Sequence, residues 1–209
     1  MSKDKNQTIE YEAPEQEMWM IREGAEQEYE VSLYTYEDYL TWPDDERWEL
    51  IDGQAIKMYA PTIQHQRISG NILFEFKLYL KGKPCEAFHA PVDVLFSVGE
   101  GADTVLQPDI LVICDRDKLE PRAVKGAPDL VVEILSPSTR NKDCTVKLQK
   151  YELHGVKEYW IIDPIAKAVT VYVLNAKGNF EATTYKDNDE VSSVVLSDFT
   201  VSLTTIFSD

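Results

Sequence analysis

"GAPDLVVEILSPSTRNKDCTVKLQKYELHGVKEYW", residues 126–160, places a single acid inside an apolar run. Residues 130–135 read as a strand that is buried on both faces, with Glu133 as the exception. An unpaired buried carboxylate is costly, so Glu133 must be paired, protonated or bound to a metal ion. The run is followed by a predicted helix at about Asp143 to His154, closed by Gly155, and then by a further strand, "KEYWIID".

Upstream of this stretch, the pattern predicts two helices and a hairpin. Helices are expected from about residue 36 to Pro43 and from about residue 63 to residue 80, the second capped by Thr62. "RWELIDGQAIKMYAP" predicts two strands joined by a type I′ turn at residues 52–53. "CEAFHAPVDVLFS" and "TVLQPDILVIC" predict one strand each. The order helix, three strands, helix, strand predicts an α/β fold with a mixed sheet.

Composition divides the chain into two parts. Residues 1–30 hold nine acids and three bases, which predicts an acidic, mobile N-terminal arm, and residues 31–209 read as a single domain. The net charge of −16 disfavours general affinity for nucleic acid. Three scattered cysteines, no apolar stretch of membrane-spanning length and no visible signal peptide predict a cytoplasmic protein without a disulfide framework.

Asp109 is the predicted partner of Glu133. It precedes the apolar run 110–113, and neighbouring strands lie about 4.8 Å apart, so two carboxylates can reach one divalent cation. Oxygen ligands with open water positions suit Mg²⁺ or Mn²⁺ rather than structural zinc. Lys147 shares a helix face with residues 144, 148 and 151, which predicts that it points inward, where an ammonium can steady a water or offset phosphate charge.

These motifs carry a family resemblance. "QPDILV", "GAPDLVVEILSPSTRNKD", Lys147, Tyr151 and "GVKEYWIIDP" resemble the Uma2 family, a domain of unknown function described as "putative restriction endonuclease" within the PD-(D/E)xK nuclease-like superfamily. "ERWELIDGQAIKMYAPTIQHQRISGNI" is also similar, and the resemblance spans roughly residues 33–206. It implies a restriction endonuclease-like core of α-β-β-β-α-β order, with a mixed central sheet flanked by helices and an N-terminal hairpin.

The resemblance also implies roles for four residues. Asp109 and Glu133 match the two acids of the superfamily pattern, and Lys147 matches a lysine that Uma2 members carry on the following helix, since Leu135 stands at the usual lysine position. Glu49 matches the upstream glutamate and is expected as a further catalytic residue and metal ligand. The implied activity is Mg²⁺- or Mn²⁺-dependent endonucleolytic hydrolysis of DNA, and a homodimer would supply two sites for two strands.

Structural interpretations stand beside these roles. Glu133 could form a buried ion pair, Asp109 could mark the entry to a strand, Lys147 could be solvated, and Glu49 could form a salt bridge of the hairpin. The alternative functions are a non-cleaving nucleic-acid or protein interaction module with the nuclease fold, and a metal-dependent hydrolase of a small phosphorylated substrate. His65, in the first turn of its helix, is expected to be satisfied or exposed, and a role at the edge of the site is the less favoured alternative.

Overall fold

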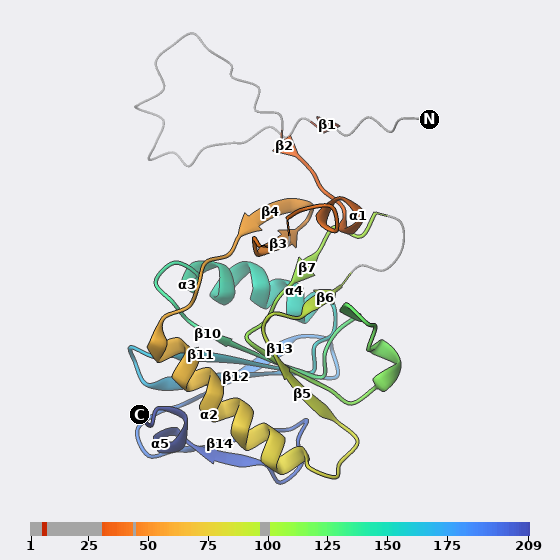
Figure 1. Ribbon diagram of the computed structural model, residues 1–209. Helices are drawn as coiled ribbons and strands as arrows, with labels where there is room; N and C mark the ends of the chain where they lie inside the picture. Colours follow the sequence, from red (N-terminus) through yellow and green to blue (C-terminus); the bar gives the residue numbers. More distant parts are fainter. Residues whose placement is uncertain (1–5, 8–30, 44, 97–100) are drawn as a thin grey trace.

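The apolar run around Glu133 forms a strand in the middle of the central sheet (Figure 1). A computed structural model describes residues 6–7, 31–43, 45–96 and 101–209. The six-stranded sheet has the order β13-β12-β11-β10-β8-β5, with β10 parallel to β11 and the other pairs antiparallel. The sheet is therefore mixed, as predicted. Its strands are β5 (Glu86–His89), β8 (Ile110–Ile113), β10 (Leu130–Ile134), β11 (Glu158–Asp163), β12 (Ala168–Leu174) and β13 (Phe180–Tyr185).

Alternation along β10 divides the core between the two faces of this sheet. Leu130, Val132 and Ile134 pack with helix α2 (Ile63–Leu80) and with the C-terminal elements β14 (Glu190–Ser192), β15 (Thr200–Ser202) and α5 (Leu203–Ile206). Val131 and Leu135 contribute to the core on the opposite face. Helix α2 has the predicted bounds, and the Thr62 side chain caps it by accepting a hydrogen bond from the backbone N–H of His65.

A second, five-stranded sheet covers the opposite face together with the helical segment 140–153. Its order is β4-β3-β7-β6-β9, and a short helix, α1 (Tyr36–Tyr39), packs beside it. The predicted hairpin joins β3 to β4, and Asp52 and Gly53 both have positive φ, as a type I′ turn requires. The strands are β3 (Trp48–Ile51), β4 (Gln54–Lys57), β6 (Asp93–Leu95), β7 (Val105–Leu106) and β9 (Ala123–Lys125).

The prediction of two strands upstream of the central stretch is wrong in one respect, because each predicted strand forms two separate strands. "CEAFHAPVDVLFS" forms β5 in the central sheet and β6 in the second sheet, and "TVLQPDILVIC" forms β7 in the second sheet and β8 in the central one. The breaks fall at Pro91 and Pro108, which have no N–H to donate to a ladder. Strand β9 was not predicted. The core order α2, β5, β8, β10, α4, β11 still follows the expected α-β-β-β-α-β pattern.

The predicted helix after β10 begins earlier than expected and is not uniform. It consists of α3 (Arg140–Lys142), a π-helical segment (Asp143–Lys147) and α4 (Leu148–Leu153). A π-helical turn within an α-helix occurs frequently at functional sites. A 3₁₀ turn (Arg116–Lys118) precedes β9.

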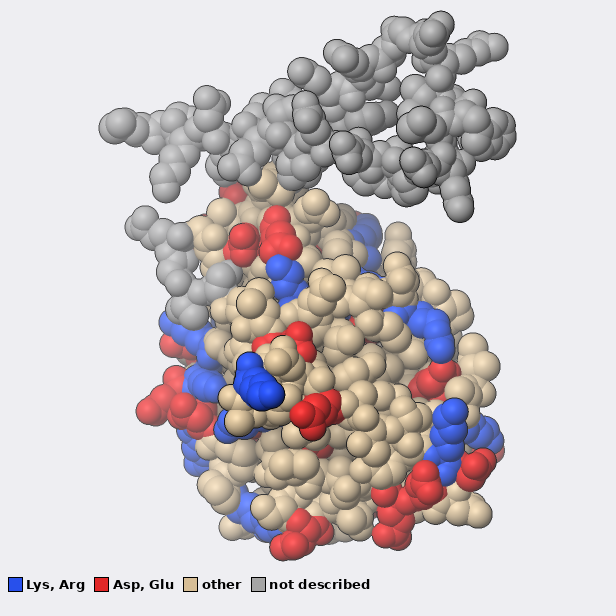
Figure 2. All heavy atoms as spheres, turned by 180° about the vertical axis from the view of Figure 1, so that it is seen from behind, with Lys and Arg blue, Asp and Glu red and all other residues tan. Residues whose placement is uncertain are grey.

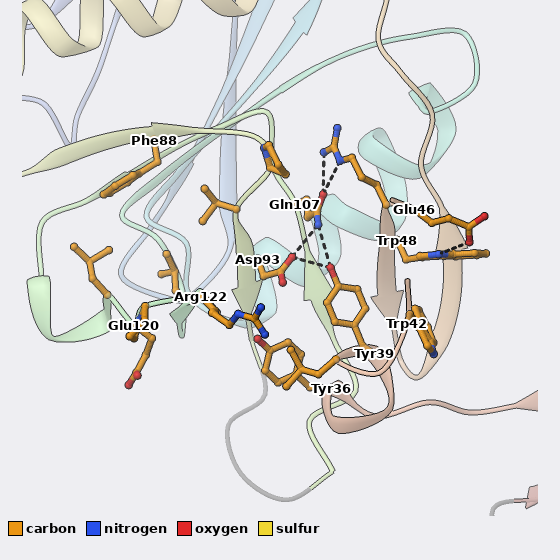
Figure 3. A pocket seen from close by; sticks show the side chains of 18 of the residues that line it. Tyr36, Tyr39, Trp42, Glu46, Trp48, Phe88, Asp93, Gln107, Glu120 and Arg122 are labelled. Atoms are coloured by element: carbon orange, nitrogen blue, oxygen red, sulfur yellow. Dashed lines mark hydrogen bonds between the residues drawn. The ribbon is translucent and has the colours of Figure 1, made fainter. Parts of the chain in front are cut away.

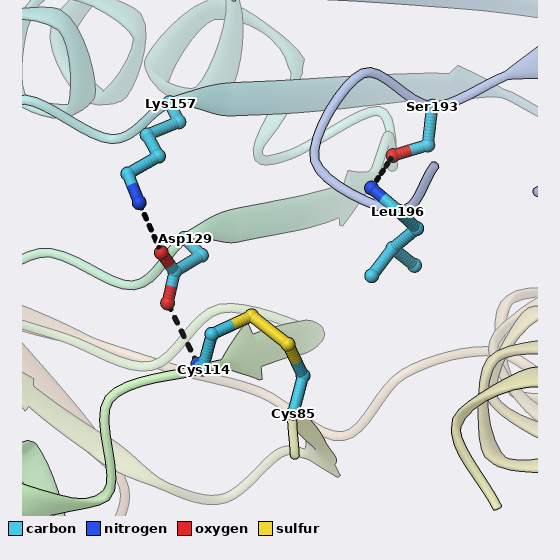
Figure 4. The surroundings of a disulfide bond; sticks show 6 residues. All are labelled: Cys85, Cys114, Asp129, Lys157, Ser193 and Leu196. Atoms are coloured by element: carbon cyan, nitrogen blue, oxygen red, sulfur yellow. Dashed lines mark hydrogen bonds and ion pairs between the residues drawn. A yellow bond between two sulfur atoms is a disulfide. The ribbon is translucent and has the colours of Figure 1, made fainter. Parts of the chain in front are cut away.

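Cys85 and Cys114 form one disulfide bond, which the scattered spacing of the three cysteines does not predict (Figure 4). The register pairs Glu86 of β5 with Ile113 of β8, and the two cysteines flank this pair on adjacent antiparallel strands. Spacing in the sequence did not reveal this, because the pairing of β5 with β8 is what brings the cysteines together. The cysteine pattern consequently no longer supports the predicted cytoplasmic location.

Most of the predicted arm lies outside the described residues. Within residues 1–30, only β1 (Asn6–Gln7) is described, and it pairs with β2 (Val31–Ser32). Over the described part of the chain, none of the helices has both the length and the apolar character needed to cross a membrane.

Candidate active site

Asp109 and Glu133 occupy facing positions on neighbouring strands. The β8–β10 register pairs Ile110 with Val132, so its continuation by one residue sets Asp109 opposite Glu133, and opposed residues of an antiparallel pair share a face. The Asp109 Oδ2 atom accepts a hydrogen bond of 2.8 Å from the backbone N–H of Ile134 and lies 3.1 Å from His65 Nε2. His65 therefore orients Asp109 from the first turn of α2.

Two side chains of the helical segment that follows β10 donate hydrogen bonds to Glu133. Lys147 Nζ and Tyr151 Oη both donate to Glu133 Oε1, each at 2.7 Å, and both side chains are buried. Residues four apart lie on one helix face, which lets Lys147 and Tyr151 reach the same oxygen. These two bonds do not use Glu133 Oε2, the second carboxylate oxygen.

Glu49 comes from the second sheet and is fully buried. Its Oε1 atom lies 2.7 Å from Lys147 Nζ and accepts a hydrogen bond of 3.0 Å from the backbone N–H of Gln107, while Oε2 accepts from Lys142 Nζ at 2.6 Å. Lys147 thus bridges Glu133 of the central sheet and Glu49 of the second sheet. The site lies where the two sheets and the helical segment meet.

Asp143 is a fourth acid that the sequence analysis did not single out. It is buried, and its Oδ1 atom lies 3.7 Å from Lys147 Nζ but has no hydrogen-bond partner within the described part of the chain. The signal available in the sequence was the spacing of four residues between Asp143 and Lys147, which places the pair on one helix face. Lys142 was also missed, because its partner Glu49 is distant in the chain.

The charges of the site are unbalanced. We call the site the acid cluster, and it comprises Glu49, Asp109, Glu133 and Asp143 with Lys142 and Lys147. Four acids face two lysines, and His65 pairs with Asp109, so full ionisation would leave at least one surplus negative charge even with His65 protonated. Burial raises the pKa of Glu133 to about 8, and the other acids add to this rise against the opposing charge of Lys147.

The remaining pKa shifts follow from the same charges. Burial alone would raise the pKa of Glu49, but the two lysines outweigh it and hold that pKa below its ordinary value. Burial raises the pKa of Asp143. Burial alone would lower the pKa of Lys147, but the surrounding carboxylates raise it well above its ordinary value, so the ammonium stays charged. Asp109 likewise outweighs burial and raises the pKa of His65.

The cluster fits a divalent cation in donor type and in charge. Its donors are carboxylate oxygens, which Mg²⁺ and Mn²⁺ prefer, and the surplus charge and the unpartnered Oδ1 of Asp143 are what a cation would satisfy. Within the described ranges, no three acidic, histidine or cysteine side chains converge closely enough to hold an ion in this conformation. Lys147 Nζ lies between Glu49 and Glu133.

The structure thus brings three of the four predicted site residues into direct contact: Glu49, Glu133 and Lys147. Asp109 stands at the neighbouring register position and is held by His65. The inward direction of Lys147 is confirmed, and Tyr151 is buried with its hydroxyl bonded to Glu133. Metal binding and catalysis by these residues stay predictions.

Comparisons with known proteins identify relatives of this chain in sequence and in fold. The Uma2 family model, described as "Putative restriction endonuclease", matches residues 36–204. "Uncharacterized protein slr1290" from Synechocystis sp. is 29% identical over 167 residues, which cover 77% of this chain and 86% of that protein. The crystal structure of "a putative nuclease belonging to DUF820" from Anabaena variabilis superposes with a TM-score of 0.68 and 25% identity, and covers 83% of this chain and 97% of that one.

The structural likeness confirms the predicted restriction endonuclease-like core. The matched range contains every residue of the acid cluster together with His65 and Tyr151, and only the N-terminal segment and the last five residues fall outside it. The chain belongs to the Uma2 family.

Proposed function

We propose that this protein is a metal-dependent endonuclease that hydrolyses phosphodiester bonds of DNA, with Asp109 and Glu133 as ligands of Mg²⁺ or Mn²⁺ and Glu49 as a further ligand. The observation that carries the proposal is the surplus of buried carboxylates at the junction of the two sheets. A bound cation would polarise the phosphate and lower the pKa of a bound water. The family description and the nuclease named among the solved structures support this proposal.

The protein's own side chains have distinct parts in this proposal. His65 and the N–H of Ile134 fix the carboxylate of Asp109. Tyr151 and Lys147 hold Oε1 of Glu133, so the other oxygen is available to a ligand. These contacts preorganise the acids before the substrate arrives, which is where electrostatic catalysis gains most.

Lys147 acts as a charge rather than as a base. The carboxylates around it raise its pKa well above the ordinary value, so it carries no lone pair with which to take a proton from water. A buried ammonium at this point offsets negative charge that develops on the phosphate. Replacing Lys147 by alanine should therefore abolish cleavage at every pH, without the recovery at high pH that loss of a general base could allow.

Surface charge limits how such a substrate binds. The net charge is −16, and on the face shown in Figure 2 the basic and acidic side chains of the described residues are interspersed, without a continuous basic area. Affinity for duplex DNA that depends only on phosphate contacts should therefore be weak. Residues 1–30 carry nine acids against three bases, and their deletion should raise affinity for DNA or the rate of cleavage.

The test combines metal binding with cleavage. Mn²⁺ at about 100 times its Kd should stabilise the wild-type protein by about 2.7 kcal/mol, because the ion binds only the folded state. Asp109→Asn and Glu133→Gln should lose this gain, whereas the exposed control Glu181→Gln should keep it. Cleavage of supercoiled, linear and single-stranded DNA should follow the same pattern, with Lys147→Ala inactive.

Contrary outcomes separate the alternatives. An unchanged Mn²⁺ effect in both acid variants would place the ion elsewhere and overturn the proposal. A confirmed metal effect without cleavage of any DNA would favour a hydrolase of a small phosphorylated substrate. Absence of both would favour a non-cleaving interaction module. A cytoplasmic location and a homodimer stay predictions, and sedimentation at several concentrations tests the second.

A further inference from the structure

A cavity beside the second sheet lies away from the acid cluster. It has a volume of about 500 Å³ and is enclosed by α1 and the segment after it, by the face of the second sheet, and by residues 119–122 (Figure 3). Trp48 lines it, whereas the next residue, Glu49, belongs to the acid cluster. Successive side chains of a strand point to opposite faces, so this cavity and the acid cluster lie on opposite faces of β3.

One residue connects the two sites. The backbone N–H of Gln107 donates to Glu49 Oε1 in the acid cluster, while the side chain of Gln107 enters the cavity. There Gln107 Nε2 donates to Asp93 Oδ1 at 2.8 Å, and Gln107 Oε1 accepts from Arg47 at 2.8 and 3.0 Å. Gln107 therefore contributes its side chain to the cavity floor and its backbone N–H to the position of Glu49.

One wall of the cavity is a continuous series of aromatic rings. Tyr36 stacks with Tyr39, whose ring centroid lies 5.4 Å from that of Trp42, and Trp42 lies 5.5 Å from Trp48. All four side chains are only half-buried. Partly exposed aromatic rings that line a cavity are suited to stacking with a flat, conjugated ligand, and stacking does not depend on which base is bound.

The cavity floor beside this wall offers a half-buried hydrogen-bond acceptor, Asp93. Asp93 Oδ1 accepts from the hydroxyl of Tyr39 at 2.9 Å and from Gln107, and neither bond uses Oδ2 (Figure 3). Burial raises the pKa of Asp93 above its ordinary value in spite of these donors. A carboxylate oxygen in this position can accept from the exocyclic amino group of a base, which is how acidic side chains read cytosine.

Positive charge at the mouth completes the site. Glu46 pairs with Lys57, and Glu120 pairs with Lys125, so the two acids of the rim are already neutralised. Arg122 is exposed, lines the cavity and has no carboxylate partner within the described part of the chain. An unpaired guanidinium beside a ring-binding cavity is a suitable contact for the phosphate of a nucleotide.

We infer that this cavity, the aromatic pocket, binds one unpaired nucleobase of the nucleic acid, stacked on the aromatic wall with its amino edge on Asp93 and its phosphate near Arg122. This inference rests on the proposed function, which makes DNA the natural substrate. It narrows that substrate to single-stranded DNA or a duplex with an extruded base. An aromatic groove could also hold a proline-rich peptide, but such a peptide does not need a carboxylate at the floor. The volume lies within the range of small-molecule sites, about 300–1,000 Å³.

The experiment measures binding without cleavage. Anisotropy of a fluorescein-labelled oligonucleotide is measured in EDTA at fixed salt, as a single strand, as a perfect duplex and as a duplex with one unpaired base. The single strand and the duplex with the unpaired base should bind about tenfold or more tightly than the perfect duplex. Trp48→Ala should remove this preference, and Arg122→Ala should weaken binding of all forms that carry an unpaired base.

Matched variants distinguish the pocket from general charge and from the acid cluster. Arg116→Ala, which removes an arginine paired with Glu86 outside the pocket, should bind as the wild type does. In competition experiments the wild type should prefer dGMP, dCMP and dAMP, whose bases carry an exocyclic amino group, over dTMP, whose base does not. Asp93→Asn should abolish this preference. Binding of an unpaired base in EDTA, together with no cleavage of any form of DNA, would leave this inference standing while the proposed function fails.

Three results would overturn the inference: equal affinity for single-stranded and duplex DNA, wild-type binding by both Trp48→Ala and Arg122→Ala, or binding of a proline-rich peptide with no effect of any nucleotide. The melting temperature of each variant is measured in parallel. Because Arg122 is exposed, its replacement tests the pocket even if Trp48→Ala fails to fold.

Discussion

Replacing Lys147 by methionine should destabilise the protein strongly. The ammonium is 2% exposed and lies 2.7 Å from both Glu49 and Glu133, so methionine would leave these acids without their shared cation. Removing one partner of a buried ion pair costs about 3–5 kcal/mol. The pKa of Glu133 is raised to about 8, so this acid is already largely protonated at neutral pH, which limits the repulsion in the variant. We therefore expect a loss near the lower limit, about 3 kcal/mol, or a fall in Tm of about 6–12 °C.

Urea unfolding in EDTA at neutral pH measures this loss, with Lys150→Met as the control. Lys150 is a near neighbour in the helical segment, and its partner Asp52 is 64% exposed, so its pair should contribute less than about 1 kcal/mol. Adding Glu133→Gln to Lys147→Met should restore part of the stability, because it removes one of the unpaired acids. That recovery distinguishes lost charge from lost packing.

The reasoning would be refuted if Lys147→Met cost less than about 1 kcal/mol, or no more than Lys150→Met. It would also be refuted if Glu133→Gln deepened the loss in the Lys147→Met background. Either result would mean that the acids of the cluster are neutral in the folded protein and do not need the ammonium.

Three further predictions concern single side chains. Tyr151→Phe should cost about 1–2 kcal/mol in urea unfolding, since it removes a buried hydrogen bond to Glu133, and no change would mean that this bond is not formed. Burial alone would raise the pKa of Asp129, but Lys157 and a backbone N–H outweigh it and lower that pKa, so its stabilising effect is complete above about pH 4 and is lost as the pH falls further. Asp129→Asn should flatten the pH dependence of stability below that point, and an unchanged slope would refute the assignment. Phe76→Ala should cost about 3–5 kcal/mol by calorimetry, because the ring packs in the core beneath the sheet, and a loss under about 1 kcal/mol would contradict that packing.

Several local elements and the identity of the central acids can be read from the amino-acid sequence alone. The bounds of α2 follow from a helical period that the apolar residues 68, 72, 76 and 80 repeat, and from the cap at Thr62. Strand β10 and the exceptional position of Glu133 can be recognised in the sequence because a strand buried on both faces contains few polar residues. Strand spacing and helix periodicity already suggested that Asp109, Glu133 and Lys147 belong to one site, and the family resemblance added Glu49.

Contacts between groups far apart in the chain depend on how the two sheets and the helical segment pack. Glu49 and Lys147 lie in different layers, and their contact exists because the second sheet packs on the helical segment beside β10. The same packing places Asp143 in the site and creates the aromatic pocket on the other face of β3. Propensity and periodicity act over a few residues, whereas ion pairs, disulfides and cavities depend on the register and layering of elements far apart in the chain, so no local pattern could have specified them.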